Sequence, residues 1–339
     1  MAALLPALRP FARALDLIDR PGGHKTHHGE VPVVGGLGMF VGLFIAVFGS
    51  GQRGQVGVSV LAISGLMVFL GALDDRFNLS PRVRLCCHLA AAVALVYGTG
   101  AVVTDLGDLL GTGVVRLGWL ALPFTVVSLV ALVNAFNMLD GLDGLAGSTA
   151  LVGFLGLGGV ASAQGQGVAL LICGSMVGAI AAFLLYNMPL HFNHAVRTFM
   201  GDAGSTLLGF LFASVALLVV QPSGHDVPPV LILWLIPIPI FELFASTARR
   251  VLKGLSPAQA DNGHFHHVLL RAGFSVRLIC AVYVLFSACS AYAGWRAYQA
   301  AVSEALLCGG FCVLFGLWLL FVANARLLVL RLPLALRRG

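Results

Sequence analysis

The chain has 339 residues, of which 59% are hydrophobic and only 10% are charged. Soluble domains carry about 25% charged residues, so this composition excludes an ordinary cytosolic protein, and its hydrophobicity excludes a disordered chain. The remaining class is an all-α, polytopic integral membrane protein. Its few charged positions are informative, because charge is expensive inside a bilayer.

Ten apolar segments can form membrane spans, which need about 20 mostly apolar residues each. In chain order they are Val33–Phe48, Val58–Leu73, Leu85–Gly100, Trp119–Phe136, Leu145–Ala161, Val168–Tyr186, Leu207–Val220, Val230–Thr247, Leu278–Trp295 and Ala305–Val322. We therefore expect about ten transmembrane helices in one membrane-embedded domain, residues 1–339. The loop 101–117 contains Gly-Thr-Gly between short β-prone runs, which predicts a small hairpin on the outer side.

The cations predict the orientation of these spans. Ten spans place both chain ends on one side, together with the loops after the even-numbered spans. Of the 20 Lys and Arg residues, all but Arg53, Arg116 and Arg296 fall on that side, which the positive-inside rule identifies as cytoplasmic. Topology and anionic lipids thus explain the net charge of +6. No basic stripe with interleaved aromatic residues indicates nucleic-acid binding.

Half of the 14 acidic residues lie at cytoplasmic span ends or in the loops that follow. They are Asp74, Asp75, Asp140, Asp143, Asp202, Glu242 and Asp261. Any one cluster is equally well read as solvated helix ends, but carboxylates at a shared depth repel one another unless a cation or proton compensates. Mg²⁺ prefers oxygen ligands and commonly bridges carboxylates to substrate phosphates. The gathering of several acidic clusters on the cytoplasmic side predicts active-site loops there that bind phosphate.

Two further stretches suit a phosphate. Residues 199–206 open the seventh span with two glycines, and a helix N-terminus there offers backbone N–H groups to an anion. The histidines His264, His266 and His267 follow a basic run, so phosphate contacts, a wet polar loop and zinc binding all stay open for them. Lys25 and its histidine neighbours precede the first span, where they suit a lipid headgroup or simply follow the positive-inside rule.

Together and in this order, these stretches resemble the polyprenyl-phosphate N-acetylhexosamine-1-phosphate transferases, a family of integral membrane enzymes. The matching runs are residues 24–27 with 32–36, 74–77, 134–144, 199–206 and 249–267, so that the resemblance covers roughly residues 16 to 275. The form His-x-His-His resembles the WecA-like branch of the family.

The resemblance implies that a lipid phosphate attacks the β-phosphate of a UDP-N-acetylhexosamine, giving polyprenyl-diphosphate-sugar and UMP. It implies undecaprenyl phosphate as acceptor and UDP-N-acetylglucosamine as donor, with other UDP-N-acetyl sugars left open. It also implies Mg²⁺, with Mn²⁺ as a substitute, a bacterial inner membrane, surrounding membrane lipids and a homodimer as one oligomeric option.

The resemblance also assigns roles to residues. Asp202 and Asn137 are the expected Mg²⁺ ligands, and Asp74 is expected to hold or deprotonate the lipid phosphate, with direct attack rather than a covalent enzyme intermediate. The expected catalytic set is Asp74, Asp75, Asp140, Asp143 and His267, and the expected substrate-binding set is Lys25, His27, Asn134, Arg197, His264 and His266.

The chain departs from the family pattern at three places. Only residues 1–8 precede Arg9, where family members begin with a full span, so we expect the first family helix to be missing or shortened. Glu242 stands where the family usually has Asp. Asn262-Gly263 precedes His264 where the family usually has an Arg, and losing a bidentate Arg bears on the donor and the rate.

Two other functions compete with this interpretation. A transporter also uses intramembrane carboxylates, but its sites tend to lie near mid-bilayer between internal repeats, and no repeat is evident here. The CDP-alcohol phosphotransferases have a motif partly similar to residues 143–146, but Gly147 stands where that motif continues with Arg.

Overall fold

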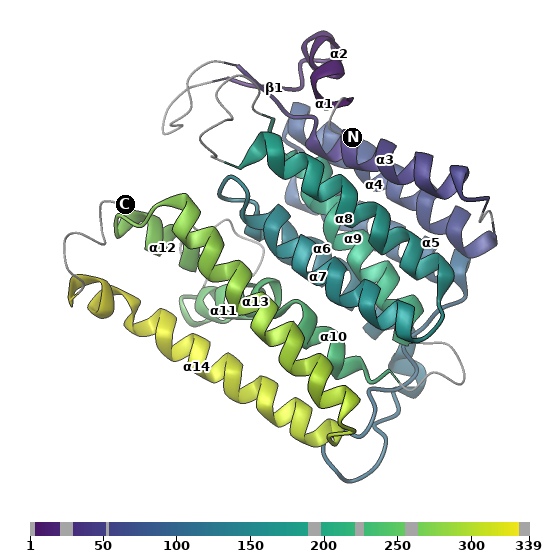
Figure 1. Ribbon diagram of the computed structural model, residues 1–339, viewed down its shortest axis with the longest axis vertical. Coiled ribbons are helices and arrows are strands. Elements are labelled where there is room, and N and C mark those ends of the chain that lie inside the picture. Colours follow the sequence, from purple (N-terminus) through teal and green to yellow (C-terminus); the bar gives the residue numbers. More distant parts are fainter. Residues whose placement is uncertain are drawn as a thin grey trace.

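The computed structural model describes residues 4–20, 30–51, 54–188, 198–220, 227–254 and 264–331, with side chains up to residue 324. The fold is all-α, as the composition predicts, and each predicted apolar segment contains a helix (Figure 1). The helices are α1 Leu4–Ala7, α2 Arg9–Ala14, α3 Gly35–Gly49, α4 Gln55–Phe77, α5 Pro81–Thr99, α6 Ala121–Leu139, α7 Leu145–Ala163, α8 Gly167–Asn187, α9 Gly201–Val220, α10 Pro229–Leu235, α11 Pro237–Leu252, α12 Phe265–Arg271, α13 Val276–Gln299 and α14 Glu304–Arg331, with a 3-10 turn η1 at Gly118–Leu120.

The apolar helices of the structure correspond to the ten expected spans with two differences in shape. In the described residues, eight helices are long and apolar enough to cross a membrane, or nine if the bent pair α10–α11 forms one span. The helix α3 is apolar but has only 15 residues. The expected eighth span over Val230–Thr247 is not one straight helix, because α10 and α11 meet at 92°. Pro237 and Pro239 lie at this break, and proline removes backbone donors that a continuous helix needs.

The helix α9 lies at the centre of the bundle. Almost all of its residues are buried, and α3, α4, α6, α7 and α8 all contact it. Small residues permit this packing: a Cβ at Gly71 of α4 would lie 2.4 Å from the Cα of Ala203 in α9, and one at Gly36 of α3 would lie 2.3 Å from the backbone nitrogen of Gly204. Close approach at small residues is typical of membrane helices, and here it fixes α3 and α4 against the start of α9.

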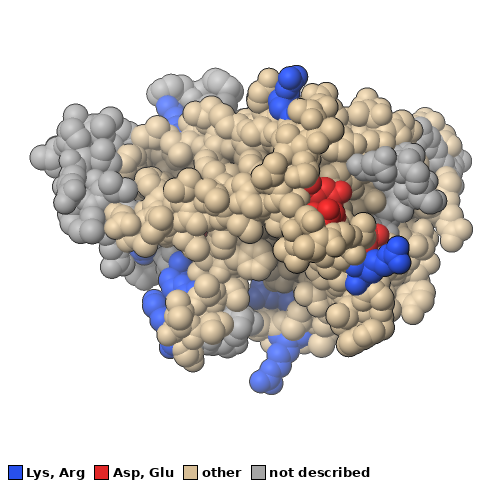
Figure 2. All heavy atoms as spheres, turned by 90° about the horizontal axis from the view of Figure 1, so that it is seen from below, with Lys and Arg blue, Asp and Glu red and all other residues tan. Residues whose placement is uncertain are grey.

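The outward-facing surface suits a lipid environment. Most of the face shown in Figure 2 is uncharged. Large apolar side chains such as Phe69 of α4 and Leu320 of α14 are exposed. Trp119, just before α6, and Tyr97, near the end of α5, are 85% and 74% exposed. Both flank the loop 101–117, at the end of the bundle opposite Asp75 and Asp140. Aromatic side chains in such positions are typical of a membrane interface.

The two ends of the bundle differ. We call the end where α4 and α6 stop and α9 begins the site end. At the opposite end, the loop 101–117 pairs Leu106 with Val115 and forms an antiparallel bridge between Asp105 and Arg116, as the predicted hairpin requires. Glu304 of α14 accepts a hydrogen bond of 2.6 Å from the Asp108 N–H, which ties this loop to α14.

A short β pair closes the site end. The strands β1 (Ile18–Asp19) and β2 (Val31–Pro32) pair antiparallel, and Val33 forms a parallel bridge with Phe199 just before α9. The preceding residues form the short helices α1 and α2, whose Leu5 and Ala12 pack with Leu17 and Val34. This arrangement carries residues 17–19 to the start of α9.

Candidate active site

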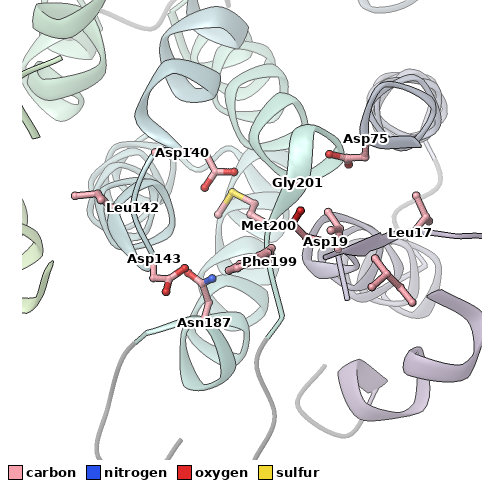
Figure 3. A pocket seen from close by; sticks show the side chains of 13 residues that line it. Leu17, Asp19, Asp75, Asp140, Leu142, Asp143, Asn187, Phe199, Met200 and Gly201 are labelled. Atoms are coloured by element: carbon pink, nitrogen blue, oxygen red, sulfur yellow. The ribbon is translucent and has the colours of Figure 1, made fainter. Parts of the chain in front are cut away.

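A cavity of about 500 Å³ lies at the site end. Its lining comes from β1, Val33, the end of α4, the loop after α6, the end of α8 and the residues that open α9. Figure 3 shows Asp19, Asp75 and Asp140 arranged around Met200 and Gly201, with Asp143 beside Asn187. Four carboxylates from three separate segments of the chain therefore border one space.

Asp75 holds the N-terminus of α9. Its carboxylate accepts hydrogen bonds from the backbone N–H groups of Asp202 at 2.7 Å and Ala203 at 3.1 Å. The first N–H groups of a helix lack partners inside the helix, and a carboxylate there is also favoured by the helix dipole. Asp75 thus acts as a cap supplied by another helix, and it fixes where Asp202 stands.

Asp202 and Asn137 meet between α9 and α6. The Asn137 Nδ2 donates to the Asp202 Oδ1 at 2.5 Å and to the Ser205 Oγ at 3.1 Å. The expected pair of metal ligands is therefore adjacent, although it comes from residues 65 apart in the chain.

Asp140 carries the clearest electrostatic strain outside the spans. Burial, followed by repulsion from Asp202, Asp75 and Asp143, raises its pKa well above the ordinary value. Asp143 also lines the cavity, and its backbone carbonyl accepts from the Cys280 thiol. These acids are held together at a cost that a cation would relieve.

Asn187 at the end of α8 shapes this loop. Its side-chain oxygen accepts from the Gly144 N–H at 2.6 Å, and its amide donates to the Thr198 carbonyl at 3.0 Å. Gly144 has φ +82°, a left-handed conformation that glycine adopts without strain. Asn187 therefore joins the acidic loop to the segment that leads into α9.

Asp74 is engaged differently from Asp75. It is buried, and its two oxygens accept from the Leu79 N–H at 2.7 Å and from Arg84 Nη1 of α5 at 2.9 Å. It does not line the cavity, but it lies close enough to Asp202 to interact electrostatically. Asp74 and Arg84 thus form a charged pair next to Asp75, outside the lining of the cavity.

The three histidines pack together at the start of α12. The rings of His264 and His266 are parallel with centroids 5.5 Å apart, and those of His266 and His267 are 4.3 Å apart. A Cβ at Gly141 would lie 2.6 Å from His266 Nε2, so the cluster borders the acidic loop rather than lining the cavity itself.

The electrostatics favour neutral rings for His266 and His267. Burial, with His267 and His264 nearby, lowers the pKa of His266 to about 2, and burial with His264 and Arg271 lowers that of His267. Within the described part of the chain, neither ring nitrogen of His266 has a hydrogen-bond partner. Buried polar groups usually have one, so this ring has unused hydrogen-bonding capacity beside the acidic loop.

The donor set fits Mg²⁺. In the described residues, no group of three or more His, Cys, Asp or Glu side chains forms a metal site on its own. Mg²⁺ commonly uses one or two carboxylates and completes its shell with waters and substrate phosphates. Asp202 provides one such carboxylate, and the Asn137 amide, which donates its N–H to Asp202 here, would add its oxygen after turning over. The repulsion felt by Asp140 is what an added cation would offset.

The remaining expected residues fall into two groups. Lys25, His27 and Arg197 lie outside the described residues. Asn134 is described, and its amide donates to the Val130 carbonyl of its own helix at 2.9 Å. The hydrogen bond to Asp202 comes from Asn137 instead.

Sequence reasoning missed three contributors to the site. Asn187 is a lone asparagine at the end of an apolar run, and Arg84 reads as an ordinary positive-inside residue. Asp19 reads as part of a polar N-terminal segment. Only their partners in space reveal them, although Asp19 stands two residues before Pro21 in the segment that carries the family resemblance.

Comparisons with known proteins agree with this site. Residues 57–220 match the model of glycosyl transferase family 4. The chain is 36% identical to an undecaprenyl-phosphate alpha-N-acetylglucosaminyl 1-phosphate transferase of Yersinia pestis, over 86% of this chain and 80% of that protein. Proteins of the same description from Haemophilus influenzae and Escherichia coli O157:H7 are 35% and 34% identical, over 95% and 90% of this chain and 90% and 86% of theirs.

Proposed function

Because the chain belongs to glycosyl transferase family 4, we propose that it transfers N-acetylglucosamine 1-phosphate from UDP-N-acetylglucosamine to undecaprenyl phosphate and releases UMP. The relatives' described activity supports the reaction. The structural observation that carries the proposal is the Asp202–Asn137 pair, held by Asp75 beside an acid-lined cavity.

The proposed chemistry is a direct displacement at phosphorus. An oxygen of the lipid phosphate bonds to the β-phosphorus, and the bond from that phosphorus to the bridging oxygen breaks, so UMP leaves with the bridging oxygen. A phosphate monoester has a second pKa of about 6, so the nucleophile is already mostly dianionic near neutral pH. The site therefore needs to position two polyanions more than to remove a proton.

Mg²⁺, with Mn²⁺ as a substitute, would be held by Asp202 and Asn137 and would neutralise charge that develops on the diphosphate. Asp75 keeps Asp202 in place through the α9 backbone. Asp140 and Asp143, which line the cavity, would contact the metal or the nucleotide. Asp74 stays the candidate to hold or deprotonate the lipid phosphate, with the attraction for the phosphate supplied by its partner Arg84.

The basic and imidazole groups would complete the substrate contacts. His264, His266 and His267 would face the diphosphate and sugar from α12, whose cluster borders the acidic loop. Lys25, His27, Asn134 and Arg197 stay predictions as substrate-binding residues.

The placement in the cell follows from the same reasoning. The chain is a multi-pass membrane protein, and its relatives are bacterial, so we place it in the bacterial inner membrane. The acidic cavity and most cations share one end of the bundle, which we assign to the cytoplasm together with the C-terminus. A homodimer stays a prediction.

A UMP-release assay tests the proposal. Purified protein is mixed with undecaprenyl phosphate and a panel of UDP-sugars, with and without Mg²⁺. We expect Mg²⁺-dependent UMP from UDP-N-acetylglucosamine, little or no activity in Asp202→Asn, and normal activity in Asp105→Asn, an equivalent change at the opposite end. Preference for another UDP-N-acetyl sugar would change the donor assignment. Failure with every donor, together with solute flux in vesicles, would replace the transferase by a transporter.

A further inference from the structure

Glu242 is a buried carboxylate at the junction of three helices. It lies in α11 after the 92° break, is only 2% exposed, and contacts the N-terminus of α12 and the middle of α13. A buried charge is costly unless it is well hydrogen-bonded, and Glu242 is: three groups point at its two oxygens.

The two oxygens of Glu242 have different hydrogen-bond partners. Oε1 accepts from the Phe265 N–H and from the Tyr283 hydroxyl, both at 3.2 Å. Oε2 contacts the His264 Nδ1 at 3.1 Å. Both donors on Oε1 require an acceptor there, and an ionised carboxylate only accepts hydrogen bonds, so this arrangement favours a proton on the His264 Nδ1. Its other ring nitrogen, Nε2, is then the one left for a substrate.

The His264 side chain also packs against the other two histidines. Its ring lies parallel to that of His266, within 4°, and His266 with His267 contacts the position of Gly141 in the acidic loop. Carboxylates that fix the tautomer and ring orientation of a metal-bound histidine typically affect metal affinity or activity about 10- to 100-fold, and we expect an effect of the same order at His264.

From these contacts we propose that Glu242 is a positioning residue, which holds His264 in its Nδ1–H tautomer and so leaves Nε2 as a hydrogen-bond acceptor for a hydroxyl or N–H group of the sugar donor. The inference rests on the proposed function, because it gives His264 a substrate to contact. It also gives a reason for a carboxylate at this place in an apolar helix.

The substitution Glu242→Gln isolates this contact. Its amide oxygen can keep the two bonds of Oε1, while its NH₂ group replaces Oε2 and favours the opposite tautomer of His264. The matched control is Tyr283→Phe, which removes one bond from the same carboxylate and leaves the His264 contact intact. A purely structural role of Glu242 predicts similar effects of the two substitutions.

The experiment is a double-mutant cycle on UMP release, using folded protein in detergent. We expect Glu242→Gln to lower kcat about 10- to 100-fold, Tyr283→Phe to stay near wild type, and Glu242→Gln to add no more than about twofold in the His264→Ala background. We also expect ¹⁵N spectra to assign the Nδ1–H form to His264 in the wild type, identified by its loss in His264→Ala, and the Nε2–H form in Glu242→Gln.

Equal losses from Glu242→Gln in both backgrounds, or an Nε2–H tautomer in the wild type, would overturn the inference. If Glu242→Gln does not fold, Glu242→Asp takes its place in the same cycle: partial activity that depends on His264 supports positioning, and independence from His264 refutes it. Wild-type protein that releases no UMP with any donor would contradict the proposed function, whereas an active wild type with additive substitutions contradicts only the role of Glu242.

Discussion

Replacing either Asp75 or Asp202 by alanine should abolish UMP release, but the two substitutions should differ in their effect on the free energy of unfolding. Asp75→Ala leaves the N–H groups of Asp202 and Ala203 without the carboxylate that caps them. Loss of a helix cap costs about 0.5–2 kcal/mol, and a donor left unsatisfied in a partly buried site costs about 1–3 kcal/mol. For two such donors, less the repulsion with Asp140 that Asp75→Ala also relieves, we expect about 2 kcal/mol in total.

Asp202→Ala removes a carboxylate that suffers repulsion from its neighbours. It loses a favourable charge in the first turn of α9, worth about 0.3–1 kcal/mol, but it relieves repulsion with Asp140. Asn137 keeps Ser205 as a partner. We therefore expect a change within about 1 kcal/mol of wild type.

Thermal unfolding of the detergent-purified variants checks this difference, with UMP release measured on the same preparations and Asp105→Asn as the control. Asp75→Ala should unfold several degrees below wild type, and Asp202→Ala close to it, while both lose turnover. Equal unfolding midpoints for the two alanine variants would refute the view that Asp75 works through the α9 backbone.

Three further predictions concern packing, metal and pH. Gly36→Ala should destabilise the fold by about 1–3 kcal/mol because its Cβ would meet the α9 backbone, whereas Gly174→Ala, which has open space, should be neutral or slightly stabilising in the same unfolding assay. Chelation should abolish UMP release by the wild type and added Mg²⁺ should restore it, whereas Asp202→Asn should stay almost inactive at every Mg²⁺ concentration; full activity in excess chelator would contradict the metal assignment. The pKa of His266, about 2 against an ordinary 6.5, lies below that of the unfolded chain, so the unfolded state binds the extra proton and stability falls as the pH drops below about 6.5, by up to about 1.4 kcal/mol per pH unit. His266→Leu should therefore flatten the dependence of the unfolding midpoint on pH between about 6.5 and 5, and parallel curves for the two proteins would speak against a buried neutral ring.

The sequence predicted the outline of the fold because hydropathy is a local property. Apolar runs such as Leu145–Ala161 are long enough to be read directly as helices. The break at Ile236 was less accessible: Pro237 and Pro239 were visible, but prolines are tolerated in membrane helices when neighbours satisfy the freed groups. Whether a proline kinks a span or redirects it by 92° depends on the surrounding helices.

The candidate site was predictable to the level of clusters. Asp140 with Asp143 and the residues around Asp202 stood out because charges are rare in this chain, and the structure brings them to one cavity. The partners of these residues were not predictable. Nothing local indicates that Asp75 caps α9, that Arg84 pairs with Asp74, or that Asn187 holds Gly144.

The sequence by itself therefore determined the membrane class, the helices and the groups able to do chemistry, because the cost of burying charge in a bilayer filters each position separately. Only the tertiary structure decided which carboxylate supports the backbone, which is paired with a cation and which is left strained beside the cavity. Those differences depend on distances of about 3 Å between residues far apart in the chain, and close packing of helices around α9 sets those distances.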